Sequence, residues 1–540
     1  MKLVTVEQMR AIEKEADARG LTYARMMENA GRALADSVLH PAFARRGTTI
    51  IGLVGPGNNG GDTLIALTHL ASAGWSATAY LVKRSQDVLV RALASAGGEI
   101  QELSRDPDGA ILTRQLKTTD MVFDGILGTG IRLSLKDEVS LALTRAGRLL
   151  AESAARPLVI AVDCPSGVDC DTGEAAPETL RADLTITMAA VKEGLLKLPA
   201  HDLVGDLQVA DIGLPTDLPS LTSLNTEVAT ASLVSSLMPK RASDSHKGTF
   251  GTALIAAGSV NYTGAALLAG RAAYRVGAGL VTMAVPAPLH GAVAGHFPEG
   301  TWVLLPHELG VIARQAAHVL AESLVRATAL LIGPGLGGEQ TTRELMQEFL
   351  TTAASPRRET AAMGFVGSRR GKVESGGRSM PPLIVDADGL RILSQMPDWD
   401  AMIPAGSVLT PHPGEMSALT GLGVEEIQAN RREVALKFAR QWQQVVALKG
   451  AFTVVAAPDG LATIIPVASS ALAKGGTGDV LAGAIVGLRA QGLGGYEAAV
   501  AGAWLHGRAG LAAARRLGAS GPVLAGDVCE ALSEAVGEIT

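Results

Sequence analysis

A glycine-rich segment near the end of the chain, Lys474–Asp479 (KGGTGD), runs directly into an apolar stretch with a helical pattern. Glycine N–H groups at a helix start face outward without side-chain cover, and the helix dipole adds positive potential there. The segment is therefore predicted to bind an anion such as a phosphate. Asp479 falls in the first turn, where a carboxylate could take a proton from a hydroxyl group beside that phosphate. The alternative is a glycine-rich turn in which Asp479 only starts the helix.

A second glycine-rich segment, Gly55–Asp62 (GPGNNGGD), follows a buried-strand pattern and precedes a helical one. It differs from the usual dinucleotide fingerprint because Asn58 and Asn59 stand where that motif has small or variable residues. Their side-chain amides suit a ribose or an amide-bearing ligand, and the carboxylate of Asp62 suits a hard cation. The segment is predicted to be a loop that ends in a ligand site.

Two later aspartates follow strand patterns in the same way, Asp124 in FDGILGTG and Asp163 in VDCPSG. Ligands of open α/β sheets bind at the carboxyl ends of the strands, so both aspartates and Gly55–Asp62 are predicted to meet at one rim. The alternative is that Asp124 and Asp163 only cap turns beside glycine and proline.

The elements that must position these residues alternate between strand and helix patterns, which predicts an α/β fold with a parallel sheet covered on both faces. In the first part of the chain, helices are expected at Thr5–Ala18, Tyr23–Leu39 and Thr63–Ala73, and strands at Thr48–Val54, Ala77–Val82, Met121–Phe123, Leu158–Val162 and Leu184–Met188. Leu214–Met238 has weak periodicity, so a domain boundary is predicted near position 225, giving domains 1–225 and 226–540.

The second domain repeats the alternation. Strands are expected at Thr252–Ala257, Ala329–Ile332, Leu383–Val385 and Val445–Leu448, a helix at Ala265–Val276, and a hairpin between Val454–Ala456 and Ala462–Ile465. Ser355–Met380 is basic and glycine-rich with few core residues. It is predicted to be a solvated inserted loop, with a phosphate-binding patch as the less favoured alternative.

Composition excludes several classes of protein. The 540 residues carry a net charge of -6 and only 3% aromatic residues, so nucleic acid is not expected as a partner. No membrane span is predicted, because the long uncharged run after Lys247 is broken at Gly258–Gly264. The N-terminus lacks an apolar signal core, and Cys164, Cys170 and Cys529 have no metal-ligand spacing. A cytoplasmic protein is expected.

The segments GPGNNGGD, VFDGILGTG and AVDCPSG together resemble the epimerase domain of bifunctional NAD(P)H-hydrate repair enzymes, and MMENAGRALAD resembles the second helix of that domain. The resemblance covers roughly the first 215 residues and implies a Rossmann-like, three-layer αβα fold. It implies that Asp163 is the acid/base group and that Asn59, Asp124 and Ser166 hold a potassium ion. The residues implied to contact the damaged cofactor are Asn58, Asn59, Gly60, Gly61, Asp62, Gly128, Thr129, Gly130, Ile131, Arg132, Leu133, Ser134 and Asp163.

Thr63 departs from this family, which usually has a glycine after Gly61-Asp62. A β-branched residue there could change how the loop approaches its ligand. Cys164 beside Asp163 suggests a nucleophile, but no activating histidine is evident, and a small buried hydrophobe is the favoured interpretation.

Six motifs in the second domain, HKGTFGTALIAAGS, IGPGLG, VDADGL, LTPHPGE, LKGAFT and AKGGTGDVLAG, resemble in this order the dehydratase half of the same enzymes, a branch of the ribokinase-like αβα fold. The resemblance implies that water is removed from the 6-hydroxyl of (6S)-NADHX or NADPHX, driven by ADP with Mg²⁺ and giving AMP and phosphate. Asp479 would deprotonate the hydroxyl as it attacks the terminal phosphate. The implied hydrate contacts are Ala253, Gly335, His412 and Asp479, and the implied adenosine phosphate contacts are Lys449, Gly450, Ala451, Phe452, Thr453 and Gly478.

Several alternatives stay open at this level. Lys449, which follows a strand, could be an exposed edge charge, and His412 could be a satisfied histidine in a proline-flanked turn. The second domain could instead be an ATP-dependent kinase of a small hydroxymethyl compound, fused to a non-catalytic binding module. The residues do not distinguish ADP from ATP or NADHX from NADPHX. A homo-oligomer is expected from the resemblance alone.

Overall fold

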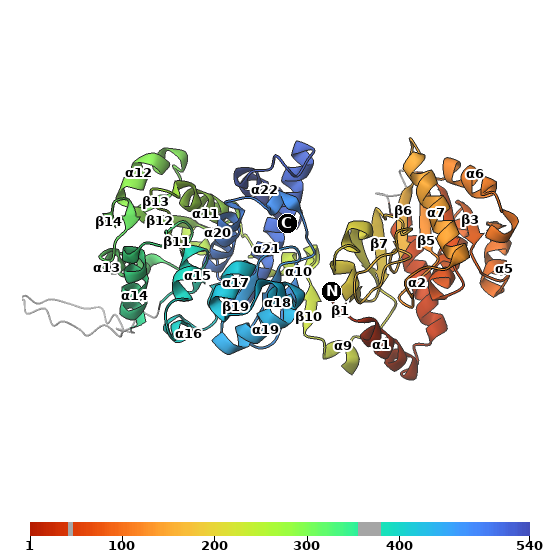
Figure 1. Cartoon of the computed structure of the whole chain (residues 1–540), viewed down its shortest axis with the longest axis horizontal. Helices are drawn as coiled ribbons and strands as arrows, with labels where there is room; N and C mark the ends of the chain where they lie inside the picture. The colour runs from red at the N-terminus through yellow and green to blue at the C-terminus, as the bar shows by residue number, and fades with distance from the viewer. Residues whose placement is uncertain (41–46, 355–379) are drawn as a thin grey trace, which may run out of the picture. The chain divides into compact units, whose positions relative to one another are not determined.

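The computed structural model describes residues 1–40, 47–354 and 380–540. The chain divides into two compact units, Met1–Glu227 and Val228–Thr540, each built around its own sheet (Figure 1). The division falls two residues after the predicted boundary at 225. The predicted insertion Ser355–Met380 lies, apart from its last residue, outside the described residues. No helix among the described residues is long and apolar enough to cross a membrane.

The first unit contains a seven-stranded, all-parallel sheet with the order β4-β3-β2-β5-β6-β7-β9. Its strands are β2 (Thr49–Val54), β3 (Ser76–Leu81), β4 (Glu99–Glu102), β5 (Met121–Gly125), β6 (Leu158–Val162), β7 (Leu184–Met188) and β9 (Asp206–Ala210). A short parallel pair, β1 (Leu3–Val4) and β8 (Val191–Lys192), accompanies it. The five strands predicted here agree with the structure to within about two residues at each end.

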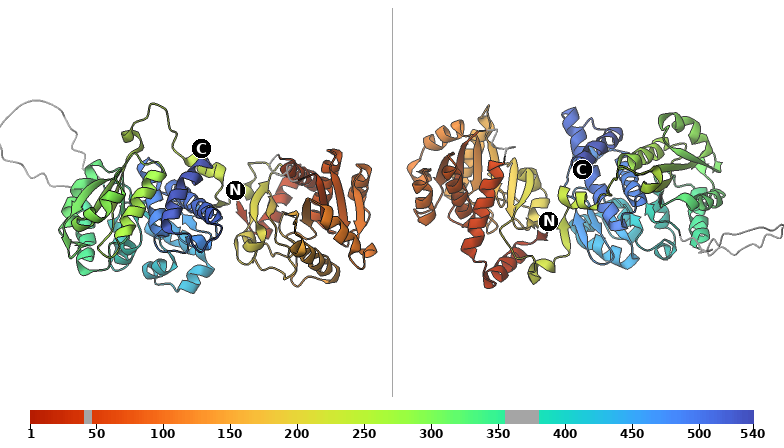
Figure 2. Two further views of the ribbon diagram at one scale, coloured as in Figure 1. Left: turned by 90° about the horizontal axis from the view of Figure 1, so that it is seen from above. Right: turned by 180° about the vertical axis from the view of Figure 1, so that it is seen from behind.

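Helices cover both faces of this sheet, as the two views of Figure 2 allow the reader to follow. Along β2, Ile50 and Val54 join one hydrophobic cluster, and Ile51 and Leu53 join another. Because side chains alternate across a strand, these clusters lie on opposite faces. The helices of the first cluster are α1 (Val6–Ala18), α2 (Tyr23–Leu39), α4 (Asn58–Ser72) and α5 (Val88–Ser95), and those of the second are α6 (Ala110–Thr118) and α7 (Asp137–Glu152). The unit is a three-layer αβα domain.

Helix α4 corrects one sequence expectation, since it begins at Asn58 and not at Thr63. Gly57 is its extended N-cap, and Gly60 lies against the backbone of Gly55, where an added Cβ would be 2.0 Å from the carbonyl oxygen. Asparagine and glycine have low helix propensity, which favoured a loop from sequence. Close packing of the helix start on the end of β2 decides the local conformation instead.

The second unit contains a ten-stranded sheet with the order β10-β21-β20-β19-β18-β17-β16-β11-β12-β13. Its strands are β10 (Thr226–Val228), β11 (Thr252–Ala256), β12 (Leu280–Pro286), β13 (Thr301–Leu305), β16 (Ala329–Ile332), β17 (Leu383–Val385), β18 (Val408–Leu409), β19 (Val445–Leu448), β20 (Val454–Ala456) and β21 (Ala462–Ile464). The strands from β13 across to β19 are parallel, and β19-β20-β21 is an antiparallel meander that contains the predicted hairpin. A small antiparallel pair, β14 (His307–Glu308) and β15 (Val311–Ile312), lies outside this sheet.

One face of this sheet packs on four helices, α11 (Thr263–Arg275), α20 (Thr477–Ala490), α21 (Gly495–Leu517) and α22 (Ala525–Gly537). Gly483 and Gly487 of α20 lie against the α11 backbone, where a Cβ at Gly483 would be 2.2 Å from Ala269 O. These glycines allow a close helix contact that anchors α20, and with it the glycine-rich segment at its start. Among the described residues, the other α-helices of this unit are α10 (Ala231–Leu237), α12 (Ala287–Val293), α13 (Ala316–Ser323), α14 (Gln340–Ala354), α15 (Asp388–Leu393), α16 (Trp399–Met402), α17 (Pro413–Thr420), α18 (Val424–Ala429) and α19 (Arg431–Trp442).

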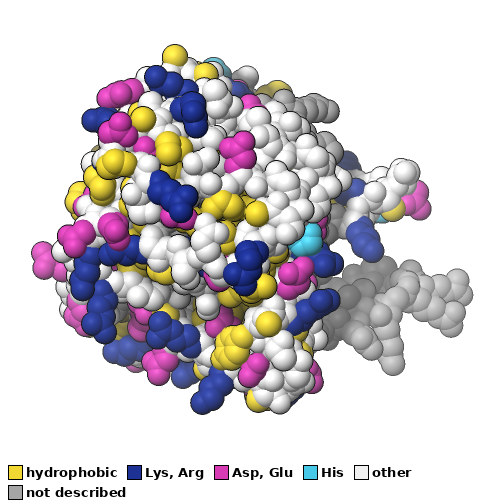
Figure 3. All heavy atoms as spheres, turned by 90° about the vertical axis from the view of Figure 1, so that its right-hand side faces the viewer, with side chains coloured by type: hydrophobic (Ala, Val, Ile, Leu, Met, Phe, Trp, Pro, Cys, Tyr) yellow, Lys and Arg dark blue, Asp and Glu magenta, His cyan; other side chains and the backbone are white. Residues whose placement is uncertain are grey.

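Surface charge agrees with the composition. On the face of the first unit that Figure 3 shows, Lys and Arg side chains are interspersed with Asp and Glu. This face therefore has no broad basic surface of the kind that binds nucleic acid.

Candidate functional sites

The first unit has a cavity of about 960 Å³ at the carboxyl ends of its central strands. Eight of the predicted contact residues line it, namely Asn58, Asn59, Asp62, Gly128, Thr129, Gly130, Ile131 and Asp163. Arg132, Leu133 and Ser134 continue the same loop as exposed residues outside the lining. Gly60 and Gly61 also lie outside it, because Gly60 packs on Gly55 and Gly61 packs on Met27 of α2. Their role in the fold is helix packing.

Asp163 is held in place by three donors to one carboxylate oxygen. Its Oδ1 accepts hydrogen bonds from Met188 N (2.9 Å) and Thr187 Oγ1 (3.0 Å), and it forms a short ion pair with Lys192 Nζ. Its backbone has φ +64°, a left-handed conformation that costs free energy and is common at functional sites. No described residue donates to Oδ2, so this oxygen is available to a ligand. Asp163 therefore does more than cap a turn.

Lys192 is a site residue that sequence reasoning missed. Its side chain is only 1% exposed, and its ammonium also donates to Thr187 Oγ1 (3.0 Å) and Met188 O (2.9 Å). A buried ammonium needs such partners, and here they include the proposed acid/base residue. The available signal was a lysine directly after the short apolar run 189–191 that follows β7.

Two further carboxyl groups face this cavity. Burial raises the pKa of Asp62 well above its ordinary value, and the nearby charges of Asp163 and Glu13 raise this pKa further. Burial also raises the pKa of Glu13, on α1, while the ammonium of Lys192 opposes that shift. Asp62 was predicted from its motif, whereas Glu13 comes from a helix that carried no motif.

The predicted potassium ligands do come together beside this cavity. Asp124 is fully buried, its Oδ2 accepts from Ser166 N (2.8 Å), and its Oδ1 has no hydrogen-bond partner. The amide of Asn59 donates to the carbonyls of Val162 (2.5 Å) and Leu127 (3.1 Å). A buried carboxylate oxygen without a donor requires an explanation, and burial raises the pKa of Asp124.

These residues offer oxygen ligands of the kind that a hard cation binds. One carboxylate oxygen, two backbone carbonyls, the Ser166 hydroxyl and the Asn59 amide supply only oxygen ligands once that amide is turned. Among the described residues, no group of three or more His, Cys, Asp or Glu could hold a metal ion, so a site for a transition metal is not supported.

Thr63 does not line the cavity. It is fully buried, its Oγ1 donates to Asn59 O (2.7 Å), and it faces the sheet at Gly52 and Gly125. A Cβ at Gly125 would lie 1.9 Å from this hydroxyl. Gly52 and Gly125 have no side chains, which leaves room for the side chain of Thr63 between α4 and the sheet. The departure from the family pattern is therefore accommodated outside the cavity lining.

Cys164 is fully buried with its thiol pKa raised by its neighbour Cys170 and by burial. A thiol of this kind is not ionised near neutral pH, so the nucleophile interpretation is not supported.

The second unit brings Asp479 and Lys449 together at the start of α20. Asp479 is in the first turn of α20, and Gly476, its N-cap, has φ +89°. The pKa of Asp479 is raised to about 7, chiefly by burial and then by the negative charge of Asp386, while the Lys449 ammonium opposes the shift. A carboxyl that titrates near neutral pH is suited to general base chemistry.

Lys449 is not an exposed edge charge. Its Nζ lies 2.6 Å from Asp386 Oδ1 and 3.6 Å from Glu415 Oε2, and Asp386 and Glu415 are both buried. Asp386 Oδ1 also accepts from Thr410 Oγ1 (2.7 Å). Residues at the ends of β17, β18 and β19 thus come together around the Lys449 ammonium. This ammonium is also close to the start of α20, because a Cβ added at Gly478 would lie 3.7 Å from Lys449 Nζ.

His412 is the N-cap of α17, and its Nδ1 accepts hydrogen bonds from Gly414 N (3.0 Å) and Glu415 N (3.3 Å). Its other ring nitrogen lies 3.3 Å from Glu415 Oε1, and the side chain is 46% exposed. Both ring nitrogens thus have partners within the turn, as the turn interpretation predicts, while the exposed edge of the ring is accessible to a ligand.

Gly335 and Ala253 differ in placement. Gly335 has φ +63° and lies against the first turn of α11, where an added Cβ would be 2.9 Å from Ala265 Cβ and 2.8 Å from Tyr262 Cβ. Ala253 is fully buried near the start of β11, within the hydrophobic core and at the opposite end of the strand from the site. The structure therefore does not bring Ala253 to the other residues. Ala265, which sequence reasoning missed, is the alanine beside Gly335.

The predicted nucleotide loop Gly450–Thr453 follows β19 directly. Thr453 Oγ1 closes it by donating to Gly450 O (3.0 Å). Arg431 supports it from α19, donating to Leu448 O (2.8 Å), and its guanidinium leaves no room for a side chain on Gly450. Ala451 and Gly450 are exposed at the tip. Behind the helix start, burial lowers the pKa of His506 to about 4, so this histidine is neutral near pH 7.

Comparisons with known proteins assign both units. A family model described as YjeF-related protein N-terminus matches residues 23–194, and one described as NAD(P)H-hydrate dehydratase matches residues 253–356 and 373–533. A bifunctional NAD(P)H-hydrate repair enzyme from Moorella thermoacetica is 36% identical, with 98% of this chain and 96% of the relative covered. The enzyme of that name from Escherichia coli K12 is 34% identical, with 98% and 93% covered.

A crystal structure of an ADP/ATP-dependent NAD(P)H-hydrate dehydratase from Bacillus subtilis, co-crystallised with ATP/Mg²⁺, is 30% identical and has a TM-score of 0.47. The match covers 59% of this chain and all of that one. Since full-length relatives exceed 30% identity across both units, the chain belongs to the family of bifunctional NAD(P)H-hydrate repair enzymes.

Proposed function

We propose that the first unit epimerises the R and S forms of NADHX and NADPHX, and that the second unit dehydrates the S form to NAD(P)H while ADP is converted to AMP and phosphate. The observation that carries the second assignment is Asp479, a carboxyl with pKa about 7 at a glycine-rich helix start beside Lys449. Membership of the repair family favours this assignment over a hydroxymethyl kinase with a non-catalytic first domain.

The dehydration follows from the chemistry of the leaving group. Hydroxide leaves poorly, whereas a phosphate ester leaves readily. Asp479 takes the proton of the C6 hydroxyl as its oxygen attacks the terminal phosphorus of ADP, and AMP departs. The amides of Gly475–Gly478 and the α20 dipole stabilise the negative charge that develops on the transferred group. The C6–O bond then breaks with release of phosphate, and loss of a proton from C5 forms the C5=C6 double bond of the reduced nicotinamide.

Most of the other predicted contacts are given roles in this proposal. Lys449 would meet a phosphate, the loop Gly450–Thr453 would hold the nucleotide, and Gly335 and the exposed ring edge of His412 would line the hydrate. Ala265, beside Gly335, takes the role that was predicted for Ala253. Magnesium bound with ADP would neutralise part of the phosphate charge. Asp388 would be a suitable oxygen ligand for it. Its carboxylate is close enough to Asp479 to raise the pKa of that residue.

In the first unit, Asp163 is proposed as the acid/base group, and Asn59, Asp124 and Ser166 as the holders of a potassium ion. A bound potassium ion supplies positive charge for the buried Asp124 and fixes the loop that contains Gly128. The three cysteines are free, which agrees with the reducing cytoplasm expected for this activity. The homo-oligomer remains a prediction.

A single assay tests the function. An R/S mixture of NADHX is incubated with ADP, ATP or no nucleotide, and recovery of the near-ultraviolet absorbance of NADH is followed. Wild type should give full, nucleotide-dependent recovery, and Asp479→Ala should give none. Asp163→Ala should give a fast phase from the S form and then a slow tail. Failure of wild type to restore absorbance with either nucleotide would reject the repair assignment.

A further inference from the structure

Asp62 is a buried carboxyl group that the proposed function so far leaves without a chemical role. It lies in α4, is 7% exposed and lines the cavity of the first unit. No described residue donates a hydrogen bond to its carboxyl group, in contrast to the three donors on Asp163 Oδ1. Because a protein does not bury an unpaired carboxylate at low cost, a carboxyl in this position is stable as the neutral acid.

The two aspartates therefore have contrasting surroundings in one cavity. Lys192, Thr187 and Met188 N all donate to Asp163, and the charge of Asp163 adds to burial in favouring the protonated form of Asp62. Pairs of titratable groups held in such different surroundings are typical of acid and base partners in catalysis.

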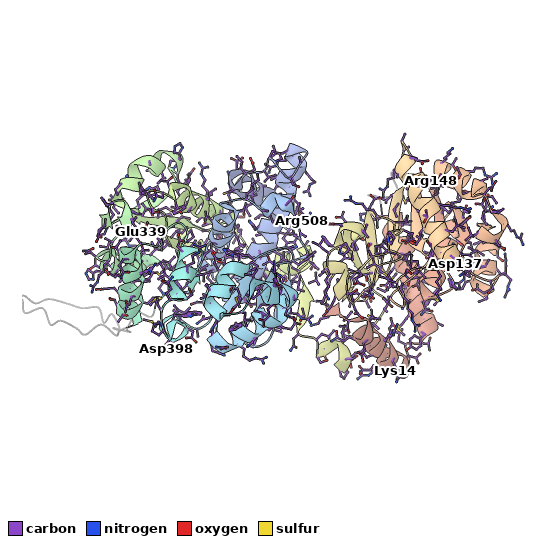
Figure 4. All side chains as sticks on the ribbon, viewed as in Figure 1. Lys14, Asp137, Arg148, Glu339, Asp398 and Arg508 are labelled. Carbon is purple, nitrogen blue, oxygen red and sulfur yellow. The ribbon has the colours of Figure 1, made fainter. Side chains whose placement is uncertain are left out.

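The other charged groups at the cavity do not neutralise Asp62. Helix α1 contributes Arg10, Glu13 and Lys14 to the lining, and Lys14, labelled in Figure 4, is exposed. Lys192 of β8 does lower the pKa of Asp62, but the effects of burial, Asp163 and Glu13 are larger. No ion pair of Asp62 with any of these basic residues occurs among the described residues.

We propose that Asp62 is the proton donor and Asp163 the proton acceptor in epimerisation, an inference that rests on the function proposed for this unit. Asp62 protonates the C6 hydroxyl of the hydrate, the C6–O bond breaks, and water leaves as the ring nitrogen lone pair forms the C6=N bond. A water molecule then attacks C6 from the other face and gives a proton to Asp163. The opposite epimer results. Exchange of protons with solvent water then deprotonates Asp163 and reprotonates Asp62, which restores the enzyme for the next turnover.

The experiment uses the full chain with Asp479→Asn, so that epimerisation is measured without dehydration. Pure S epimer is supplied, and formation of the R epimer is followed by chromatography. Asp62→Asn should lower kcat by at least about 100-fold and change KM less than about threefold, because the amide keeps the shape but cannot release a proton. Asp62→Glu should recover part of kcat. In ¹⁸O-labelled water, newly formed R epimer should contain the label.

Two comparisons separate a chemical role from a structural one. Glu7→Gln removes a carboxylate from the exposed side of α1 and should leave kcat unchanged. With Asp62 present, kcat should fall as pH rises through its raised pKa, and Asp62→Glu should move this alkaline limb. A kcat loss below about tenfold in Asp62→Asn, a large loss confined to Glu13→Gln, or no ¹⁸O in the product would overturn the proposal. Absence of epimerisation in the Asp479→Asn parent would instead overturn the function proposed for the unit.

Discussion

Lys449 Nζ lies 2.6 Å from Asp386 Oδ1, and this ion pair joins the ends of two strands under the start of α20. Lys449→Met would leave Asp386 buried and unpaired, which costs about 3–5 kcal/mol of unfolding free energy. It would also remove the charge that lowers the pKa of Asp479, so the pH at which dehydration begins should rise.

Chemical denaturation and a pH–rate profile of Lys449→Met check both effects. Lys437→Met is the matched control, because Lys437 is exposed on α19 and its replacement should change stability by less than about 0.5 kcal/mol. Equal stability of the two variants would show that the ion pair between Lys449 and Asp386 does not contribute to the free energy of unfolding.

The pKa of Asp479 sets the pH dependence of dehydration. A general base acts when ionised, so kcat should rise with pH through about 7 and level off above it. His506 cannot produce this step, because its pKa of about 4 keeps it neutral throughout the range. The profile is measured with saturating hydrate and ADP, and a flat profile between pH 5.5 and 8.5, about 1.5 units either side of 7, would contradict the assignment.

The raised pKa of Asp479 also predicts a gain in stability when its carboxyl group is removed. Folding raises this pKa from 3.8 to about 7, so the folded state binds more protons than the unfolded state between these two values. The free energy of unfolding therefore falls as pH rises through this window, by about 1.4 kcal/mol for each pH unit. Asp479→Asn should melt at a higher temperature than wild type at pH 8 and at a similar temperature at pH 4. A variant that is less stable than wild type at pH 8 would argue against a buried, destabilising carboxylate.

Asp124 Oδ1 predicts a cation effect that can be measured without substrate. Potassium should raise the melting temperature of the first unit, and lithium should not. At a potassium concentration a hundredfold above Kd, the unfolding free energy should rise by about 2.7 kcal/mol. Asp124→Asn should abolish the difference between the two ions, since it removes the negative charge. Identical melting curves in potassium and lithium for wild type would remove the basis for the ion site.

Two glycines at the start of α20 should respond to substitution in opposite ways. Gly478 has ordinary helical space, with Lys449 Nζ 3.7 Å from an added Cβ, so Gly478→Ala should keep or slightly raise stability while its methyl group raises KM for ADP. Gly476 has φ +89°, and a Cβ there would be 2.8 Å from Leu268 Cδ1. Gly476→Ala should therefore lower stability by more than about 1 kcal/mol.

Thermal melts and ADP titrations of the two variants distinguish these outcomes. An unchanged KM for ADP in Gly478→Ala would place the terminal phosphate away from the α20 start.

The alternation of strand and helix patterns was sufficient to predict two α/β units. The polar residues that follow strands gave the positions of Asp124 and Asp163, and the glycine-rich helix start gave that of Asp479. Such residues are found because period and strand ends are local properties of the chain. Motif position did not show that Ala253 lies in the core at the start of β11, because a motif does not state which end of its strand reaches the site.

Only the tertiary structure decided which groups share a site and in which protonation state. Lys192 is 29 residues from Asp163 in the chain, and Lys449 is 63 residues from Asp386. The pKa values of Asp62 and Asp479 depend on burial and on charges from other strands, which no local pattern contains. The sequence by itself thus determined the chemical groups and their strand ends, and long-range packing decided their partners, because both desolvation and Coulomb energy depend on distance in space.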